Sequence, residues 1–182
     1  MKSLFFRLAT FSVASFFLGL MSIAQTSPEF SHPHATLLGD AGQGTILKFN
    51  FADPSFKEVT TQYGNAIIPS VGDDLPLLEK GAPSLTKSYV AIMIDGQSKT
   101  EVEIISSVYT DYNDIEIAPS KGNLFRNVDP NDVAFAKGPV YNEDAFYPSE
   151  LATLSEPYIQ RGVRGQAVWG LPYAIQPSNK NS

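Results

Sequence analysis

Cysteine and histidine, the side chains most used for nucleophilic catalysis, are nearly missing from this chain. The 182 residues include no cysteine and only two histidines, His32 and His34. The histidines flank Pro33 in a segment rich in Ser, Pro and Gly. No Cys–His or Ser–His pair can be assembled there on an ordered core. Two solvated histidines without carboxylate support predict no metal site either. We therefore predict a protein that is not an enzyme and that has no cofactor.

Two clusters of acidic and amide side chains resemble the start of a calcium-binding loop. Both lack the central Gly and the closing Glu of an EF-hand loop, so we expect neither to bind metal. Glu101 and Glu103 are spaced to share one face of a strand, where solvated charges explain them better than paired catalytic carboxylates. The clusters are Asp111, Asn113 and Asp114, and Asp129, Asn131 and Asp132.

The basic residues around position 125 suggest recognition rather than catalysis. Lys121 and Arg126 bracket a short segment of turn formers that can expose its side chains, including Phe125. A guanidinium can form a two-pronged pair with a carboxylate, which is among the stronger polar contacts. Composition alone favours a simpler interpretation without a binding role, in which Arg126 is an ordinary surface charge or pairs with Asp129.

The first 24 residues are typical of a secretory signal peptide. Lys2 and Arg7 form a positive start, residues 8–23 are apolar or small, and Ser22-Ile23-Ala24 is a small-x-small cleavage signal. The apolar run is short for a membrane-spanning helix, and no basic stop-transfer cluster follows it. The mature chain is predicted to start at Gln25, with a secreted or periplasmic location and no membrane contact after signal removal.

The mature part is acidic and has no disulfide to stabilise it. Removing Lys2 and Arg7 leaves 11 basic against 19 acidic residues, a net charge of −8. This charge argues against nucleic acid as a partner and favours a basic protein surface. About 158 residues suffice for one domain held together by its core alone.

The elements that must position the basic loop are predicted to be short strands. Residues 25–43 are expected to be a flexible leader. Alternating apolar residues predict strands at 45–51, 57–63, 86–94, 101–110, 158–163 and 166–173. The Asp95-Gly96 turn predicts a hairpin between 86–94 and 101–110. Residues 144–154 could form a helical turn or two, interrupted by Pro148. An all-β, antiparallel β-sandwich (jelly-roll-like) follows, with long loops and at most one short helix.

Several motifs in one order resemble a known family. They are EKGAP from Glu79, EVEIISS from Glu101, IAPSKG from Ile117, RNVDP from Arg126, YNEDAFYP from Tyr141, ELATLSEPY from Glu150 and RGVRGQ from Arg161. Together they resemble the N-terminal prodomain of gingipain-type cysteine peptidases, over about residues 40–177. The resemblance covers nearly all of the mature chain.

The resemblance implies a β-sandwich that helps its peptidase fold and blocks its cleft until it is cut away. These peptidases cleave after Arg or Lys, so their specificity pocket carries negative charge. The matching inhibitory loop is residues 121–130, with Arg126 as the pocket residue and Lys121 and Phe125 beside it. The implied partner is therefore the catalytic domain of a gingipain-type peptidase.

Two departures from the family pattern leave alternatives open: the catalytic domain is missing from this sequence, and so is the C-terminal sorting domain that usually takes family members to the cell surface. The family's catalytic domain, and a further strand before it, would lie beyond Ser182, so residues 44–182 are interpreted as a prodomain truncated at its C-terminal end. The Pro-rich tail at 172–177 is expected to end the last strand, since proline cannot continue a ladder. Without the family's further strand, Trp169, Tyr173 and Ile175 are expected to be partly uncovered, which predicts self-association through an exposed sheet edge. The alternatives are a secreted binding module that uses Phe146, Tyr147 and Trp169 as anchors, or a non-functional fragment of a zymogen.

Overall fold

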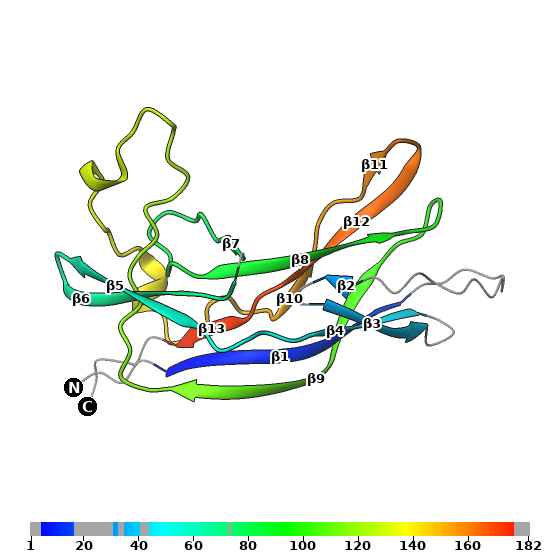
Figure 1. Cartoon of the computed structure of the whole chain (residues 1–182), viewed down its shortest axis with the longest axis horizontal. Helices are drawn as coiled ribbons and strands as arrows, with labels where there is room; N and C mark the ends of the chain where they lie inside the picture. Colours follow the sequence, from blue (N-terminus) through cyan, green and yellow to red (C-terminus); the bar gives the residue numbers. More distant parts are fainter. Residues whose placement is uncertain (1–4, 17–30, 33–34, 41–43, 73, 177–182) are drawn as a thin grey trace.

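The fold is built almost entirely from β-strands packed in layers (Figure 1). The computed structural model describes residues 5–16, 31–32, 35–40, 44–72 and 74–176. In this part of the chain the helical elements are two short 3-10 turns, η1 (Pro130–Asp132) and η2 (Pro139–Asn142). No helix among these residues is long and apolar enough to cross a bilayer.

The first sheet has six strands within the described residues. Its order is β13-β1-β4-β3-β2, and β9 pairs with the other side of β1. All of these pairings are antiparallel. The strands are β1 (Phe5–Phe16), β2 (Ser31–His32), β3 (Ala35–Asp40), β4 (Gly44–Phe49), β9 (Glu101–Tyr112) and β13 (Tyr173–Gln176).

The second sheet covers the first and carries the long hairpin seen at the upper right of Figure 1. Its order is β10-β12-β8-β7, with β11 paired to the end of β12. A separate two-stranded ribbon, β5 (Ser55–Thr61) and β6 (Gly64–Ser70), lies beside the loops. The strands of the second sheet are β7 (Leu75–Pro76), β8 (Thr86–Met93), β10 (Ala152–Leu154), β11 (Tyr158–Gln160) and β12 (Val163–Gly170).

Side chains from both sheets meet in one apolar core. Its members lie at alternating positions along the strands, because successive side chains of a strand point to opposite faces of the sheet. Leu47 and Phe49 of β4 are buried while Lys48 between them is exposed, as the sequence pattern predicted. The core cluster includes Phe49, Leu85, Val90, Ile117, Val168, Tyr173 and Ile175. The prediction of an all-β antiparallel sandwich is confirmed.

The connection between β8 and β9 differs from the predicted hairpin. Both strands exist near their predicted positions, but β8 pairs with β12 and β7, whereas β9 pairs with β1 in the other sheet. The loop at Asp95-Gly96 therefore crosses from one layer to the other. The hairpin prediction was wrong because alternation reports which face is buried and not which strand lies alongside.

Three further segments differ from the sequence-based expectations. The predicted leader at 25–43 contains β3, which pairs with β4, and Ala35 is buried. The predicted helical turn at 144–154 does not form, and its end is strand β10. The last turn lies at Arg161-Gly162, where both residues have positive φ, and β12 runs without interruption through the gap expected between strands at 158–163 and 166–173.

The chain end is better covered than its prolines suggested. Residues 173–176 form β13, which pairs with β1 from Gln176 to Tyr173. Tyr173 and Ile175 are 1% and 0% exposed, and Trp169 is half-buried. The expectation that Tyr173 and Ile175 lack apolar cover was therefore wrong, since Pro172 precedes the strand and does not interrupt it.

Packing of the core predicts a contrast between two leucines near β8. Leu85 is 1% exposed and Leu78 is 49% exposed. Leu85→Ala should lower the free energy of unfolding by about 2–5 kcal/mol, because it removes buried methyl groups and leaves a cavity. Leu78→Ala, the matched control, should change it by less than about 1 kcal/mol. Urea unfolding of both variants checks this, and equal effects would contradict the assigned core.

Candidate functional site: the loop that carries Arg126

The tip of the 121–130 loop is a tight turn centred on Arg126. The amide of Val128 donates to the carbonyl oxygen of Phe125 at 3.0 Å, which places Arg126 and Asn127 at the two central positions of a β-turn. Arg126 and Asn127 are exposed, and the neighbouring Phe125 is 81% exposed. No hydrogen bond or ion pair joins the Arg126 guanidinium to another described residue. The turn therefore presents a cation and an aromatic ring to solvent.

The two ends of this loop are joined by side chains from within it. The Lys121 ammonium donates to the carbonyl oxygen of Pro130 at 2.7 Å and lies 4.1 Å from the ring centre of Phe135. The Asp129 carboxylate accepts from the amide of Asn131 at 2.8 Å and caps η1. Asp129 thus bonds to the backbone and not to Arg126. Lys121 closes the loop, while Arg126 and Phe125 project from it.

The segment that leads into the loop is held on both sides by backbone hydrogen bonds. On one side Ala118 donates to the carbonyl oxygen of Ile67 in β6 at 2.9 Å. On the other side Ser120 donates to Ala82 at 2.7 Å, and Ser84 donates to Ala118 at 2.9 Å. Ile117 and Ala118 are both fully buried. The loop therefore starts from a fixed point in the core.

Gly81 and Gly122 allow close backbone approach at this starting point. A Cβ added at Gly81 would lie 3.2 Å from the Cα of Gly138, and one added at Gly122 would lie 2.9 Å from the Cβ of Lys80. Both residues have positive φ, which L side chains rarely adopt. The amide of Gly138 donates to the carbonyl oxygen of Gly81 at 2.8 Å, so the segment after the loop is bound to the same place.

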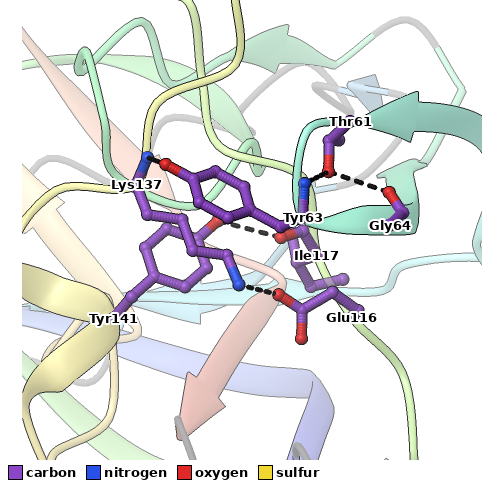
Figure 2. Close-up of polar contacts among 7 residues, drawn as sticks. All are labelled: Thr61, Tyr63, Gly64, Glu116, Ile117, Lys137 and Tyr141. Atoms are coloured by element: carbon purple, nitrogen blue, oxygen red, sulfur yellow. Dashed lines mark hydrogen bonds and ion pairs between the residues drawn. The ribbon is translucent and has the colours of Figure 1, made fainter.

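A cluster of polar side chains fastens the segment after the loop to the segment before it (Figure 2). Lys137 forms an ion pair with Glu116, and its backbone amide donates to the Tyr63 hydroxyl at 3.3 Å. The Tyr141 hydroxyl donates to the carbonyl oxygen of Ile117 at 2.9 Å. We call Tyr63, Glu116, Lys137 and Tyr141 the loop-base cluster. It joins η2 and the β5–β6 turn to the root of the loop.

Tyr141 is held in the protonated form that this contact needs. Burial raises the pKa of the Tyr141 hydroxyl far above its usual range, and the nearby Glu116 carboxylate adds to the shift. A neutral phenol keeps its O–H to donate to the Ile117 carbonyl. The buried carbonyl of Ile117 therefore has a permanent side-chain donor.

Two of the three aromatic side chains proposed as alternative anchors, Tyr147 and Trp169, lie away from the loop, and the hollow they line does not include Phe146. Tyr147 and Trp169 lie in an open hollow of about 410 Å³ with Glu79, Lys87 and Leu171. The Tyr147 hydroxyl donates to Glu79 at 2.8 Å, and the Lys87 ammonium lies 3.9 Å from the Trp169 ring centre. These rings are half-buried and engaged with neighbours. The exposed aromatic side chain on the loop is Phe125.

Metal-binding groups do not gather anywhere in the described part of the chain. No three His, Asp or Glu side chains there are placed to hold an ion together. Asp129, Asn131 and Asp132 serve as the cap and first turn of η1. Residue 34 lies outside the described residues, and only the backbone of His32 is described, in β2.

The fold and the loop define a β-sandwich that presents a braced basic turn. A family model described as Propeptide_C25 matches residues 25–181. Gingipain R2 of Porphyromonas gingivalis is 34% identical over 180 residues, which are 99% of this chain and 24% of that protein. Gingipain R1 of the same species is 33% identical over 175 residues. The chain belongs to the C25 propeptide family, the propeptides of gingipain-type peptidase zymogens.

Solved structures agree with this assignment. The structure titled as a complex of the Porphyromonas gingivalis RgpB pro- and mature domains matches with a TM-score of 0.73 and 31% identity, over 80% of each chain. A structure on the zymogenic latency of gingipain K matches with a TM-score of 0.62 at 18% identity, which shows a shared fold. The chain spans about a quarter or less of the length of the curated relatives it matches.

The loop-base cluster was missed by the sequence analysis. Tyr141 begins one of the family-like motifs, and the Gly138-Pro139 pair signals a turn, but neither names a partner. Glu116 and Lys137 are separated by 21 positions, and Tyr63 and Lys137 by 74. Contacts at such separations follow from the fold and have no local signal.

The loop-base cluster predicts a specific effect of Tyr141→Phe. The variant should lose about 1 kcal/mol of stability at neutral pH, because the Ile117 carbonyl loses its donor. The pKa of the Tyr141 hydroxyl is raised in the folded state. The stability that this protonated hydroxyl contributes is therefore complete below its unfolded pKa of about 10 and is lost as pH rises above that value. Above about pH 10, the free energy of unfolding of the variant should therefore fall less steeply with pH than that of the wild type.

Thermal or urea unfolding at neutral pH and at about pH 11 measures both effects. Tyr158→Phe is the matched control, because Tyr158 is exposed in β11. Identical behaviour of the two variants would show that the Tyr141 hydroxyl does not hold the loop base.

Proposed function

We propose that this propeptide binds the catalytic domain of a gingipain-type cysteine peptidase and inhibits it through Arg126. The observation that carries the proposal is the state of that side chain: it stands exposed at the centre of a turn and pairs with no described residue, on a loop closed at its base. A side chain held this way has lost part of its freedom before binding. Such preorganisation lowers the entropic cost of association.

The chemistry of Arg126 suits the pocket that the family resemblance implies. Peptidases that cleave after Arg or Lys need negative charge where the substrate's basic side chain enters. A guanidinium can pair with a buried carboxylate through two parallel hydrogen bonds, and it stays charged at any working pH. Arg126 would therefore occupy the pocket as a substrate side chain does.

Phe125 supplies the apolar part of the same contact. Its ring is 81% exposed, although complete burial of such a side chain is worth about 1.5–3 kcal/mol. Arginine and the aromatic residues, Phe included, are enriched at the cores of protein–protein interfaces. Lys121 acts differently in this proposal, since its ammonium already bonds within the loop and holds the turn in place.

Export and assisted folding complete the proposed role. Residues 1–24 carry the features of a signal peptide, and the matched family domain begins at residue 25. We propose that the chain acts outside the cytoplasm, in the periplasm or beyond, and that its preformed sandwich also helps the peptidase fold. The mature chain's charge of −8 favours a basic docking face on the peptidase.

The inhibition proposal predicts a large loss with Arg126→Ala. The inhibition constant against an Arg-specific gingipain should rise by about 30- to 1,000-fold, equivalent to about 2–4 kcal/mol, because the pocket carboxylate loses its partner. Arg126→Lys should lose less against gingipain K than against the Arg-specific enzyme. Steady-state inhibition assays with both peptidases measure these changes.

Arg161→Asn is the matched control, because it removes an exposed arginine from the β11–β12 turn and Asn tolerates the positive φ found there. The control should inhibit as wild type does. Unchanged inhibition by Arg126→Ala would remove Arg126 from the pocket. Absence of inhibition by the wild-type chain would remove the partner itself.

A further inference from the structure

Three arginines follow residue 24 in the sequence, and the structure places them in very different surroundings. Arg164 lies inside β12, between β11 and β8, and its guanidinium donates to three carbonyl oxygens of the β8–β9 loop at 3.1, 2.6 and 3.2 Å. Arg126 belongs to the loop that Lys121 closes at its base. Arg161 stands exposed at the tip of the β11–β12 hairpin. Arg161 is therefore the arginine whose peptide bond is least enclosed.

The backbone of this hairpin turn does not suit an arginine. Arg161 and Gly162 are its two central residues, with φ of 50° and 79°, and Gln160 pairs with Val163 directly across the turn. Two-residue turns with positive φ at both positions favour Asn-Gly or Gly-Gly, because side chains larger than that of glycine crowd the backbone there. Opening of the turn relieves this crowding at Arg161.

Strand β11 is weakly held to the rest of the second sheet. It is three residues long, and among the described residues it pairs only with β12. Residues 156–163 are all exposed. The Tyr158 ring lies against Gly165, where an added Cβ would be 3.0 Å from it. A segment with so few buried contacts opens locally at low free energy, while β12 keeps its pairings with β8 and β10.

The hairpin lies far from the loop that carries Arg126. Figure 1 shows the β11–β12 hairpin projecting at one end of the long axis of the molecule and the loop before η1 projecting at the other. A peptidase bound at Arg126 therefore leaves the hairpin accessible to a second peptidase molecule. Exposed loop tips of this kind are preferred sites of proteolytic nicking.

We propose that the Arg161–Gly162 peptide bond is a release site of the propeptide, hydrolysed by a second Arg-specific peptidase molecule when β11 opens. One water is consumed: the C–N bond breaks, the carbonyl carbon of Arg161 takes the hydroxyl and becomes a carboxylate, and Gly162 becomes a free amine. The identity of the cutting enzyme rests on the proposed function, in which the partner peptidase accepts arginine.

The cut would separate the core into two chains. The fragment that starts at Gly162 carries β12 and β13, with the core residues Val168, Tyr173 and Ile175. A covalent link holds these strands at a high effective concentration, and hydrolysis removes that link. The cut propeptide therefore stays assembled when concentrated and dissociates on dilution or in mild denaturant. Loss of this fragment removes the core on which the Arg126 loop is built.

Limited digestion of the full chain by trypsin tests the site without any reference to inhibition. Terminal sequencing and mass spectrometry, before and after denaturation, identify the first cut beyond residue 24. We expect a new N-terminus at Gly162, with the two parts staying together until they are denatured. Arg161→Asn should slow the first cut roughly tenfold or more.

Two tyrosine variants test whether the cut requires β11 to open. Tyr158→Ala removes the ring that lies against Gly165 and should speed the cut several-fold, because proteolysis follows the population of the open form. Tyr109→Ala is the matched control, since Tyr109 is similarly exposed but lies in β9, and it should leave the rate unchanged. Equal rates for Tyr158→Ala and wild type would overturn the opening of β11.

An Arg-specific gingipain then replaces trypsin, at two molar ratios. With the peptidase in excess, the first cut should again fall at Arg161–Gly162; with the propeptide in excess, the chain should stay intact. A first cut at Arg126, Arg164 or a lysine with trypsin would overturn the proposal, and so would a trypsin cut at Arg161 that excess gingipain does not reproduce. Failure of the proposed inhibition has a different signature, because gingipain would then cut Arg161–Gly162 at both ratios.

Discussion

The backbone hydrogen bonds of residues 116–120 are the constraint on which the rest of this structure depends. They join β6 on one side to residues 82–84 on the other, and they bury Ile117 at the centre of the core. A buried backbone must have its donors and acceptors paired, so this segment has little freedom to shift. The Arg126 loop starts directly after it. The position of an exposed turn is therefore set by one of the most buried segments of the chain.

The loop shows how one set of basic residues divides into different roles. Lys121, Arg126 and Lys137 are all cations near the same loop, but Lys121 bonds to Pro130 and Lys137 pairs with Glu116. Only the Arg126 guanidinium is left pointing to solvent without a partner among the described residues. Internal pairing of the other two brings both arms of the loop together. The rigidity supplied by the lysines would favour the recognition proposed for Arg126, because a fixed turn loses less entropy on binding.

Much of the fold could be read from alternating side chains, but their pairing could not. The pattern of Leu47 and Phe49, and that of Ser88 and Val90, predicted buried strand faces, and those faces are buried. The same patterns suggested that β8 and β9 form a hairpin, whereas each pairs within a different sheet. Burial is a property of one strand, while pairing depends on edges that many strands share. Proline at 172 likewise suggested an end to the sheet, yet β13 begins directly after it.

The sequence by itself determined that this chain has no thiol chemistry, that it resembles a prodomain, and that Arg126 lies in a loop of turn formers. These conclusions need only residue types and their order. The tertiary structure decided that Lys121 faces inward, that Tyr141 supports the loop through Ile117, and that β1 completes the first sheet. Each of these is a contact between segments distant in sequence. Such contacts depend on how the layers pack, and no local pattern of residues encodes them.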